Sequence, residues 1–349
     1  ALIDSVDPSY RELLFARLAE LGVGALDYIV SNHAEQDHSG SLPELLERFP
    51  AARVLATPRG KGMLQDHLHL PDERIVTVAD GTTVDLGGRT LRFLHFPFVH
   101  WPETMVTYLE EERILFSCDL FGSHLAVADL LGAELAALLP GAKRYYAEIM
   151  MPFRPLIAKS MPKVAAQALD LIAPSHGPVI QDPAGMLAAH ADWLGDEPRN
   201  LAVIAYISMH DSTRRMARHL CEALGARGVG VEVFCLTNAD LGRFAMALVD
   251  AATLVLGSPM VAAGAHPVVA YAASIANMLK PRLRHTATIG SLGWGGRLAE
   301  QLAALMPGIK AEALPPVLAR GLPRAAALAA LDALADAIAA RHDGLAPAR

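Results

Sequence analysis

The sequence predicts two domains, an α+β domain over residues 1–195 and a doubly wound α/β domain over residues 196–349. The chain has 349 residues, which is long for a single hydrophobic core. Before residue 195, short strand and helix patterns follow one another in an irregular order. After the polar segment GDEPRN (195–200), strand and helix patterns alternate regularly. Regular alternation indicates a parallel sheet with helices on both faces.

Three segments of the first domain are β-rich, namely YIVSN (28–32), RTLRFLHF (89–96) and RILFS (113–117). RTLRFLHF alternates between apolar and polar residues, as a half-buried strand does. The chain opens with Ala instead of Met, and ALIDS has the pattern of a strand already under way. We therefore expect the natural protein to begin earlier, so that N-terminal strands of the first domain are missing.

The second domain contains five candidate strands, at LAVIAYI (201–207), VGVEVFC (229–235), ATLVLGS (252–258), HTATIGS (285–291) and IKAEAL (309–314). Helical patterns separate them, the first from about Ser212 to Arg227. Apolar residues at helical spacing predict a further packed helix over the alanine-rich stretch 325–340. Five strands in about 150 residues favour a flavodoxin-like order of the sheet.

The composition excludes several classes of protein. Hydrophobic residues make up 52% and charged residues 19% of the chain, which is typical of a folded globular protein. The net charge is −7 and no basic stripe is present, so we expect no nucleic-acid partner. No apolar run has the length of a membrane span. The three cysteines form no CxxC pair, which indicates a reducing compartment and no fused rubredoxin-like module; we expect a cytoplasmic protein.

The stretch SNHAEQDHSG (31–40) places four possible metal ligands within six positions: His33, Glu35, Asp37 and His38. A polar loop that happens to contain two histidines is the simpler alternative. The metal interpretation gains weight because the motif follows a β-rich run, where a loop at a strand end can direct ligands into a shared cleft.

Three more candidates stand near turns further along the chain: His100 in FPFVHWPE, Asp119 in FSCDLFG and His176 in APSHGP. A two-metal site needs about three protein ligands for each ion and a bridging group, which these seven residues supply. Three of the seven are carboxylates, and carboxylate oxygen favours iron over zinc. The sequence therefore predicts a site for two metal ions.

The spacing of these motifs resembles the metallo-β-lactamase-like domain, whose hydrolases usually carry His at the position of Glu35. With Glu there, the chain resembles the flavodiiron proteins (A-type flavoproteins), as do LFSCDLFGSH and AKRYYAEIMMPF. The resemblance covers essentially the whole chain. It implies a metallo-β-lactamase-like αββα sandwich followed by a flavodoxin-like doubly wound parallel sheet. It also implies one iron on His33, Glu35 and His100, a second on Asp37, His38 and His176, and Asp119 as the bridge.

Two neighbouring residues carry weaker predictions. His124 and Tyr146 could donate hydrogen bonds to the metal ligands or line a substrate pocket. Packing in the core is an equal alternative for Tyr146.

Three loops of the second domain have features of a binding site for a planar, phosphorylated cofactor. YISMHDST (206–213) offers hydroxyl groups at a helix N-terminus, which favours a phosphate. GSPMVAAGAHP (257–267) is rich in small residues, and GSLGWGG (290–296) surrounds an indole with glycine. Ordinary helix caps and turns are the alternative.

The same loops resemble the FMN-binding loops of flavodiiron proteins, although Asp211 stands where the family usually has Gly. The resemblance implies FMN contacts from Ser208, Met209, His210, Ser212, Thr213, Ser258, Pro259, Met260, Gly264, Ser291, Leu292, Gly293, Trp294 and Gly295.

The resemblance implies an oxidoreductase that reduces O2 to water, NO to N2O, or both, with electrons relayed through FMN. The electron donor is expected to be a separate rubredoxin-like protein or flavoprotein reductase, and the assembly a head-to-tail homodimer or a dimer of dimers. One alternative is a dizinc hydrolase fused to a flavodoxin-like domain. Another is an electron carrier without an active metal site.

Overall fold

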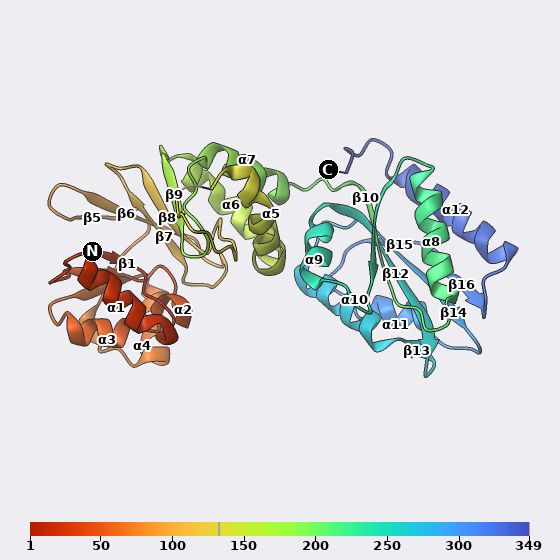
Figure 1. Cartoon of the computed structure of the whole chain (residues 1–349), viewed down its shortest axis with the longest axis horizontal. Helices are drawn as coiled ribbons and strands as arrows, with labels where there is room; N and C mark the ends of the chain where they lie inside the picture. Colours follow the sequence, from red (N-terminus) through yellow and green to blue (C-terminus); the bar gives the residue numbers. More distant parts are fainter. Residues whose placement is uncertain (132, 349) are drawn as a thin grey trace. The chain divides into compact units, whose positions relative to one another are not determined.

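The structure, a computed structural model, describes residues 1–131 and 133–348 and contains two compact units. The first comprises Ala1–Tyr146 and Phe153–Leu194, and the second comprises Ala147–Pro152 and the chain from Gly195 onward. Figure 1 labels most helices and strands of each unit and colours them along the chain. In these described ranges, no helix is both long and apolar enough to cross a membrane.

Two sheets form the centre of the first unit. One contains four parallel strands in sequential order: β1 (Leu2–Ile3), β2 (Tyr28–Val30), β3 (Arg53–Ala56) and β4 (Ile75–Thr77). The other contains β5 (Thr83–Asp85), β6 (Thr90–His95), β7 (Met105–Leu109), β8 (Ile114–Cys118) and β9 (Leu171–Pro174). Its first four strands are antiparallel, and β9 runs parallel to β8. Val30 and Leu55 of the first sheet pack with Phe93 and Met105 of the second in one buried cluster.

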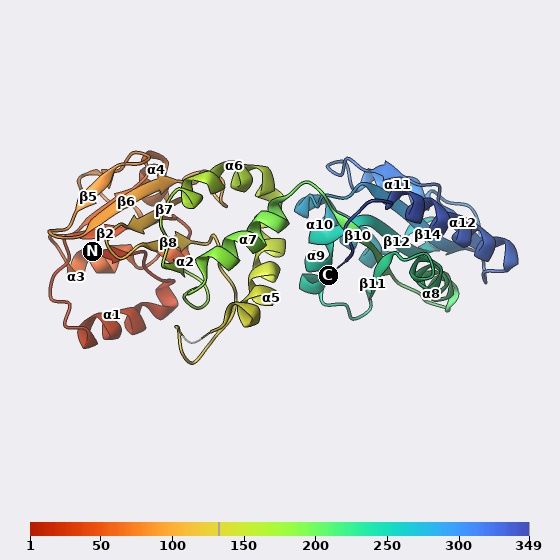
Figure 2. The same ribbon diagram turned by 90° about the horizontal axis from the view of Figure 1, so that it is seen from above.

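Helices cover the outer faces of these sheets. The four helices of the first half are α1 (Arg11–Glu20), α2 (Gln36–Ser39), α3 (Leu42–Arg48) and α4 (Pro58–Leu68). Leu45 of α3 and Leu64 of α4 pack with Ile29 and Val54 of the first sheet. Beside the second sheet lie α5 (Leu135–Tyr145), α6 (Arg154–Ala165) and α7 (Pro183–Leu194), as Figures 1 and 2 show. This order of layers confirms the predicted αββα sandwich.

The second unit is built on one largely parallel sheet in the order β11-β10-β12-β14-β15. Its strands are β10 (Arg199–Tyr206), β11 (Gly230–Cys235), β12 (Ala251–Val261), β14 (His285–Leu292), β15 (Glu312–Ala313) and β16 (Val317–Arg320), with β13 (Gly264–Ala265) antiparallel to β12. Numbered along the chain, the main order is 2-1-3-4-5, that of the flavodoxin-like sheet. The doubly wound fold is therefore confirmed.

Helices lie on both faces of this sheet. They are α8 (Ser212–Gly225), α9 (Leu241–Asp250), α10 (Pro267–Leu279), α11 (Leu298–Ala304) and α12 (Ala325–Arg341). Leu220 of α8 and Ile338 of α12 share a buried cluster with Ile204 and Ile289 of the sheet. The remaining three helices lie on the opposite face in Figures 1 and 2.

One element differs from the prediction. The segment 309–314, expected to form one strand, contains only the short β15, and the chain pairs with β14 again at β16. Pro315 and Pro316 separate the two short strands, and proline lacks the amide hydrogen that a continuous ladder needs.

The first unit contains a buried histidine that is not among the predicted ligands. His190 on α7 packs against Phe121 and Trp193, with ring centroids 4.6 and 4.7 Å away, and its Nδ1 lies 3.1 Å from the carbonyl oxygen of Met186. Burial lowers the pKa of His190 to about 4. At a pH between about 4 and 6.5, the ring is therefore neutral in the folded state and protonated in the unfolded chain.

We predict that the stability of the first unit falls as the pH is lowered from about 6.5 to about 4. Over this range only the unfolded chain binds a proton at His190. The loss approaches about 3 kcal/mol when both states are protonated. His190→Leu should flatten this acid limb in urea titrations at several pH values. His67→Leu, at an exposed position of the same unit, is the matched control. An unchanged acid limb in His190→Leu would contradict the prediction.

Candidate metal centre

All seven predicted metal ligands lie on loops or short turns at the ends of strands. His33 follows β2, and Glu35 is the residue directly before the single-turn helix α2. That turn contains both Asp37 and His38, which explains how two adjacent residues can face one site. The other three follow three strands of the second sheet: His100 after β6, Asp119 after β8 and His176 after β9.

Asp119 lies at the centre of the cluster. Its Oδ2 atom lies 3.6 Å from Nε2 of His33 and 3.5 Å from Nε2 of His100. Its Oδ1 atom lies 3.2 Å from Nε2 of both His38 and His176. Each oxygen of one carboxylate therefore faces a different pair of imidazole rings.

The two remaining carboxylates divide in the same way. Oε2 of Glu35 lies 3.2 Å from Nε2 of His33 and 3.4 Å from Nε2 of His100. Oδ2 of Asp37 lies 3.2 Å from Nε2 of His176 and 3.5 Å from Nε2 of the neighbouring His38. The structure thus brings the seven residues together as two triads that share Asp119.

The protonation of the cluster is set by burial and mutual contacts. Burial opposes charge on Asp119, but contacts with the facing imidazoles outweigh it and hold the pKa of this carboxyl well below its usual range. Burial disfavours the charged form of His33, yet hydrogen bonds to Glu103 and Glu35 raise its pKa to about 10. Contacts with Asp119 and Asp37 raise the pKa of His176 to about 9. A metal ion that binds at neutral pH must therefore displace protons.

The donor set fits metal ions. Imidazole nitrogen and carboxylate oxygen converge within each triad, and both are metal ligands when the imidazole is neutral. Oδ1 of Asp37 is buried and has no hydrogen-bond partner among the described residues. A buried polar atom without a partner is costly, and a bound cation would satisfy it.

The cluster has a closed side and an open side. The side chains of His33, His38 and Asp119 are at most 2% exposed, whereas those of Glu35 and Asp37 are 41% and 40% exposed. A small molecule can therefore approach from the side of Glu35 and Asp37.

Tyr146 and His124, the two weaker predictions, lie at different distances from the ligand cluster. The hydroxyl of Tyr146 donates to the carbonyl oxygen of Trp193 at 3.1 Å. Instead Tyr145, which the sequence did not single out, donates to Oδ1 of Asp119 at 2.8 Å. The ring of His124 lies 4.9 Å from that of Tyr145 and 6.0 Å from that of His176, at the edge of the cluster. Adjacent tyrosines give no sequence signal that tells which one faces the metal ligands.

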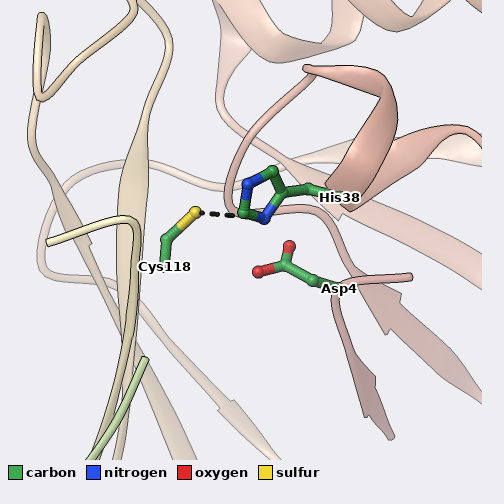
Figure 3. Close-up of side chains that lie close together, drawn as sticks. All are labelled: Asp4, His38 and Cys118. Carbon is green, nitrogen blue, oxygen red and sulfur yellow. Dashed lines mark hydrogen bonds between the residues drawn. The ribbon is translucent and has the colours of Figure 1, made fainter. Parts of the chain in front are cut away.

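Sequence reasoning also missed the groups behind two of the histidines. Nδ1 of His33 lies 2.6 Å from Oε1 of Glu103, and both side chains are buried. Nδ1 of His38 lies 3.6 Å from Sγ of Cys118. Figure 3 shows that Cys118 and Asp4 both face the ring of His38. These three contacts join residues that are far apart in the chain, so spacing cannot reveal them.

A second pocket lies in the second unit, at the carboxyl ends of β10, β12 and β14. It has a volume of about 390 Å³. Oγ of Ser208, which lines it, is buried and has no hydrogen-bond partner in the part of the chain that the structure describes. The predicted residues that line it are Ser208, Met209, His210, Ser212, Thr213, Pro259, Met260, Ser291, Leu292, Gly293 and Trp294, joined by Val261, Ala262 and Gly321.

Three predicted cofactor residues do not line this pocket. Oγ of Ser258 accepts a hydrogen bond from the amide of His266 and donates to the carbonyl of Pro259, so it braces the loop. Gly264 belongs to β13, where a Cβ atom would collide with the side chain of Gln301. Gly295 follows Trp294 in the third loop.

Asp211, the departure from the family pattern, does not face the pocket. Its backbone has a left-handed φ of +68°, a conformation in which Gly is favoured, although Asp tolerates it better than most residues. Its carboxylate accepts hydrogen bonds from Arg214 and Arg215 on the exposed first turn of α8. These contacts keep its charge away from the predicted phosphate position.

Comparison with known proteins identifies the family of this chain. A family model described as "ODP family beta lactamase" matches residues 1–177. A nitric oxide reductase from Moorella thermoacetica is 36% identical over 318 residues, which are 89% of this chain and 80% of that protein. Type A flavoprotein fprA from Rhodobacter capsulatus is 32% identical over 321 residues, 89% of this chain and 74% of that protein. The chain belongs to the flavodiiron family.

The solved structures agree with this membership. Rubredoxin oxygen:oxidoreductase from Desulfovibrio gigas is similar to this flavodiiron protein with a TM-score of 0.93 and 28% identity. The similarity covers 97% of this chain and 87% of that one. The chain is therefore an oxidoreductase of the flavodiiron type, and its likeness to β-lactamases is one of fold.

We predict that Asp119→Asn weakens metal binding at both triads, because the substitution removes the charge that faces both of them. The amide keeps the shape of the side chain, so the fold should persist. Metal affinity should fall more than about 100-fold, since changes to groups that merely support ligands already cost 10–100-fold. Metal analysis after dialysis, with the exposed Asp27→Asn as control, checks this. Loss of one ion alone would contradict the shared role of Asp119.

Proposed function

We propose that this flavodiiron protein binds two iron ions and one FMN, and that it reduces O2 to water, NO to N2O, or both. The observation that carries the proposal is the Asp119 carboxylate, which presents one oxygen to each of two ligand triads. Bound iron would supply the redox chemistry at which O2 or NO reacts, and bound FMN would take up electrons singly or in pairs.

The residues favour iron over zinc at this site. Glu35, Asp37 and Asp119 contribute three negative charges, which offset the charge of two highly charged metal ions better than imidazole does. His33, Glu35 and His100 are assigned to one iron, and Asp37, His38 and His176 to the other. Asp119 is assigned as the bridge.

The protein's own part is to position ligands and to control access. The Tyr145 hydroxyl, 2.8 Å from Oδ1 of Asp119, holds the proposed bridging carboxylate in place. Burial of His33 and His38 excludes water from one side. The exposed side chains of Glu35 and Asp37 leave the other side open to a small gas molecule and to protons from solvent.

The second pocket is assigned to FMN. Backbone amides at the N-terminus of α8, with the hydroxyls of Ser208 and Ser212, suit a phosphate group. Oγ of Ser208, which has no hydrogen-bond partner among the described residues, supports this assignment. Trp294 is 69% exposed and can contact a flat ring system without rearranging the core.

We further propose that electrons reach FMN from a separate donor, a rubredoxin-like protein or a flavoprotein reductase. A head-to-tail homodimer, or a dimer of such dimers, would bring the FMN of one subunit to the irons of another.

The names of the relatives include both oxygen and nitric oxide as substrates. No observation favours a hydrolase, and the filled ligand positions argue against a simple electron carrier.

The proposal is tested by measuring iron and flavin on the full chain, produced with ample iron and purified without oxygen. We expect about two irons and one FMN per chain. Anaerobic reduction followed by addition of O2 or NO should then reoxidise the flavin. Two zinc ions that iron cannot replace, or FMN without any metal, would contradict the proposal.

We predict that Glu35→His shifts metal preference toward zinc and abolishes O2 reduction, because an imidazole replaces one of the three carboxylates. The measurement is metal content after growth with equal iron and zinc, together with oxygen consumption. Glu47→His, on the exposed face of α3, is the matched control. Unchanged metal content and activity in Glu35→His would count against its assignment as a ligand.

A further inference from the structure

We propose that Glu103 is the positioning residue of the metal centre, which fixes the ring of His33 so that Nε2 faces the iron. The inference rests on the proposed diiron function. It concerns a residue outside the seven proposed ligands.

The contact between the two residues is short and buried. Nδ1 of His33 lies 2.6 Å from Oε1 of Glu103, while Nε2 on the other side of the ring faces Glu35 and Asp119. If Nδ1 carries the hydrogen and donates it to the carboxylate, Nε2 is left with the lone pair that a metal requires. A hydrogen bond to the far nitrogen is the usual means of fixing the orientation of a metal-binding histidine.

Glu103 is itself firmly held. The same Oε1 atom accepts a hydrogen bond from the backbone amide of Ala34 at 2.9 Å, so one oxygen fastens both the ring of His33 and the loop that carries it. The hydroxyl of Thr57 donates to the carbonyl oxygen of Glu103 at 2.9 Å. The residue is 3% exposed.

The charge of Glu103 also points to the metal centre. Its second oxygen, Oε2, is buried and has no hydrogen-bond partner within residues 1–131 and 133–348. A buried carboxylate with so few partners is unfavourable unless a positive charge lies nearby. The His33 ring supplies that charge when it is protonated, and a cation bound at Nε2 would supply it when Nε2 has no hydrogen.

The four-residue segment from His100 to Glu103 combines several of these contacts. His100 is a proposed ligand, and the ring of Trp101 packs edge-on against His33 with centroids 4.9 Å apart. Glu103 then contacts Nδ1 of the same His33 ring. One short stretch thus supplies a ligand and restrains a second ligand 70 residues away in the sequence.

The Nδ1 atom of His38 has a different neighbour from the Nδ1 atom of His33. Its Nδ1 faces the Cys118 thiol at 3.6 Å, and a thiol is a weaker hydrogen-bond partner than a carboxylate. Asp4 lies on the same side of the ring, as Figure 3 shows, but its carboxylate accepts hydrogen bonds from the backbone and side chain of Asn32. The direct carboxylate contact is made to His33.

The test measures how fast the full, diferrous chain gives up iron to ferrozine without oxygen. Glu103→Ala removes the contact and should release iron about 10–100-fold faster. Glu103→Gln keeps an oxygen at the same reach and should restore retention to within about threefold of the wild type, which separates positioning from charge. Tyr108→Phe, which loses a hydrogen bond to Ala168 in the same unit, should match the wild type.

Proton NMR gives a second readout that general destabilisation does not produce. Fe(II) shifts the signal of a bound imidazole N–H far from the others, and the contact with Glu103 should protect the His33 N–H from exchange with solvent. We expect this signal in the wild type and in Glu103→Gln, and its loss in Glu103→Ala. Glu103→Leu, of similar volume, replaces the alanine variant should that variant fail to fold.

Retention of iron in Glu103→Ala at the wild-type rate would overturn the inference, as would equal losses in the alanine and glutamine variants. A wild-type chain that takes up no iron would overturn the diiron proposal and this inference with it. A wild-type chain with two irons and an unaffected Glu103→Ala would overturn this inference alone.

Discussion

The structure of the candidate site depends on one carboxylate placed between four imidazole rings. Asp119 presents one oxygen to His33 and His100 and the other to His38 and His176. Without this negative charge, the half-exposed carboxylates of Glu35 and Asp37 would be the only ones left within the two triads to offset four basic rings. The position of Asp119 depends in turn on Cys118, whose φ of +53° turns the chain sharply at the end of β8. Such a left-handed conformation costs of order 1 kcal/mol or more and persists because the surrounding structure enforces it.

Both proposed sites follow from where strands end. In the first unit, loops after β2, β6, β8 and β9 bring ligands from two different sheets to one place. In the second unit, the order 2-1-3-4-5 aligns the carboxyl ends of three parallel strands, and the loops that follow them line one pocket. Rigid sheets hold these loops, which is how loop residues can form sites with little freedom to move.

Much of the fold and many of the candidate site residues could be predicted from the sequence, because the signals are local. HAEQDH places four possible ligands within six residues, and each loop of the proposed FMN pocket follows a recognisable buried strand. The resemblance to a known family supplied the division of ligands between two metal ions. Glu103, Tyr145 and Cys118 carry no such signal, since their roles depend on which residues the tertiary fold brings beside them.

The residues that the sequence did not single out were missed for equally specific reasons. Tyr145 could be recognised as the neighbour of Asp119 only by knowing which face of the last turn of α5 lies against that carboxylate. Asp211, which departs from the family pattern, directs its carboxylate to two arginines on the first turn of α8. Pro315 and Pro316 directly follow the fifth predicted strand in the sequence, but the return of the chain to β14 at β16 carries no such local signal.

The proposed ligands come from four separate segments of the chain, between residues 33 and 176. Closing such large loops is slow and entropically unfavourable, so these segments can meet only after both sheets of the first unit have paired. Small zinc domains behave differently, because their ligands are near in sequence and the metal organises an otherwise unfolded chain. In this protein we expect the reverse order, in which the polypeptide completes the pocket first and the proposed iron ions would then bind to a nearly finished structure.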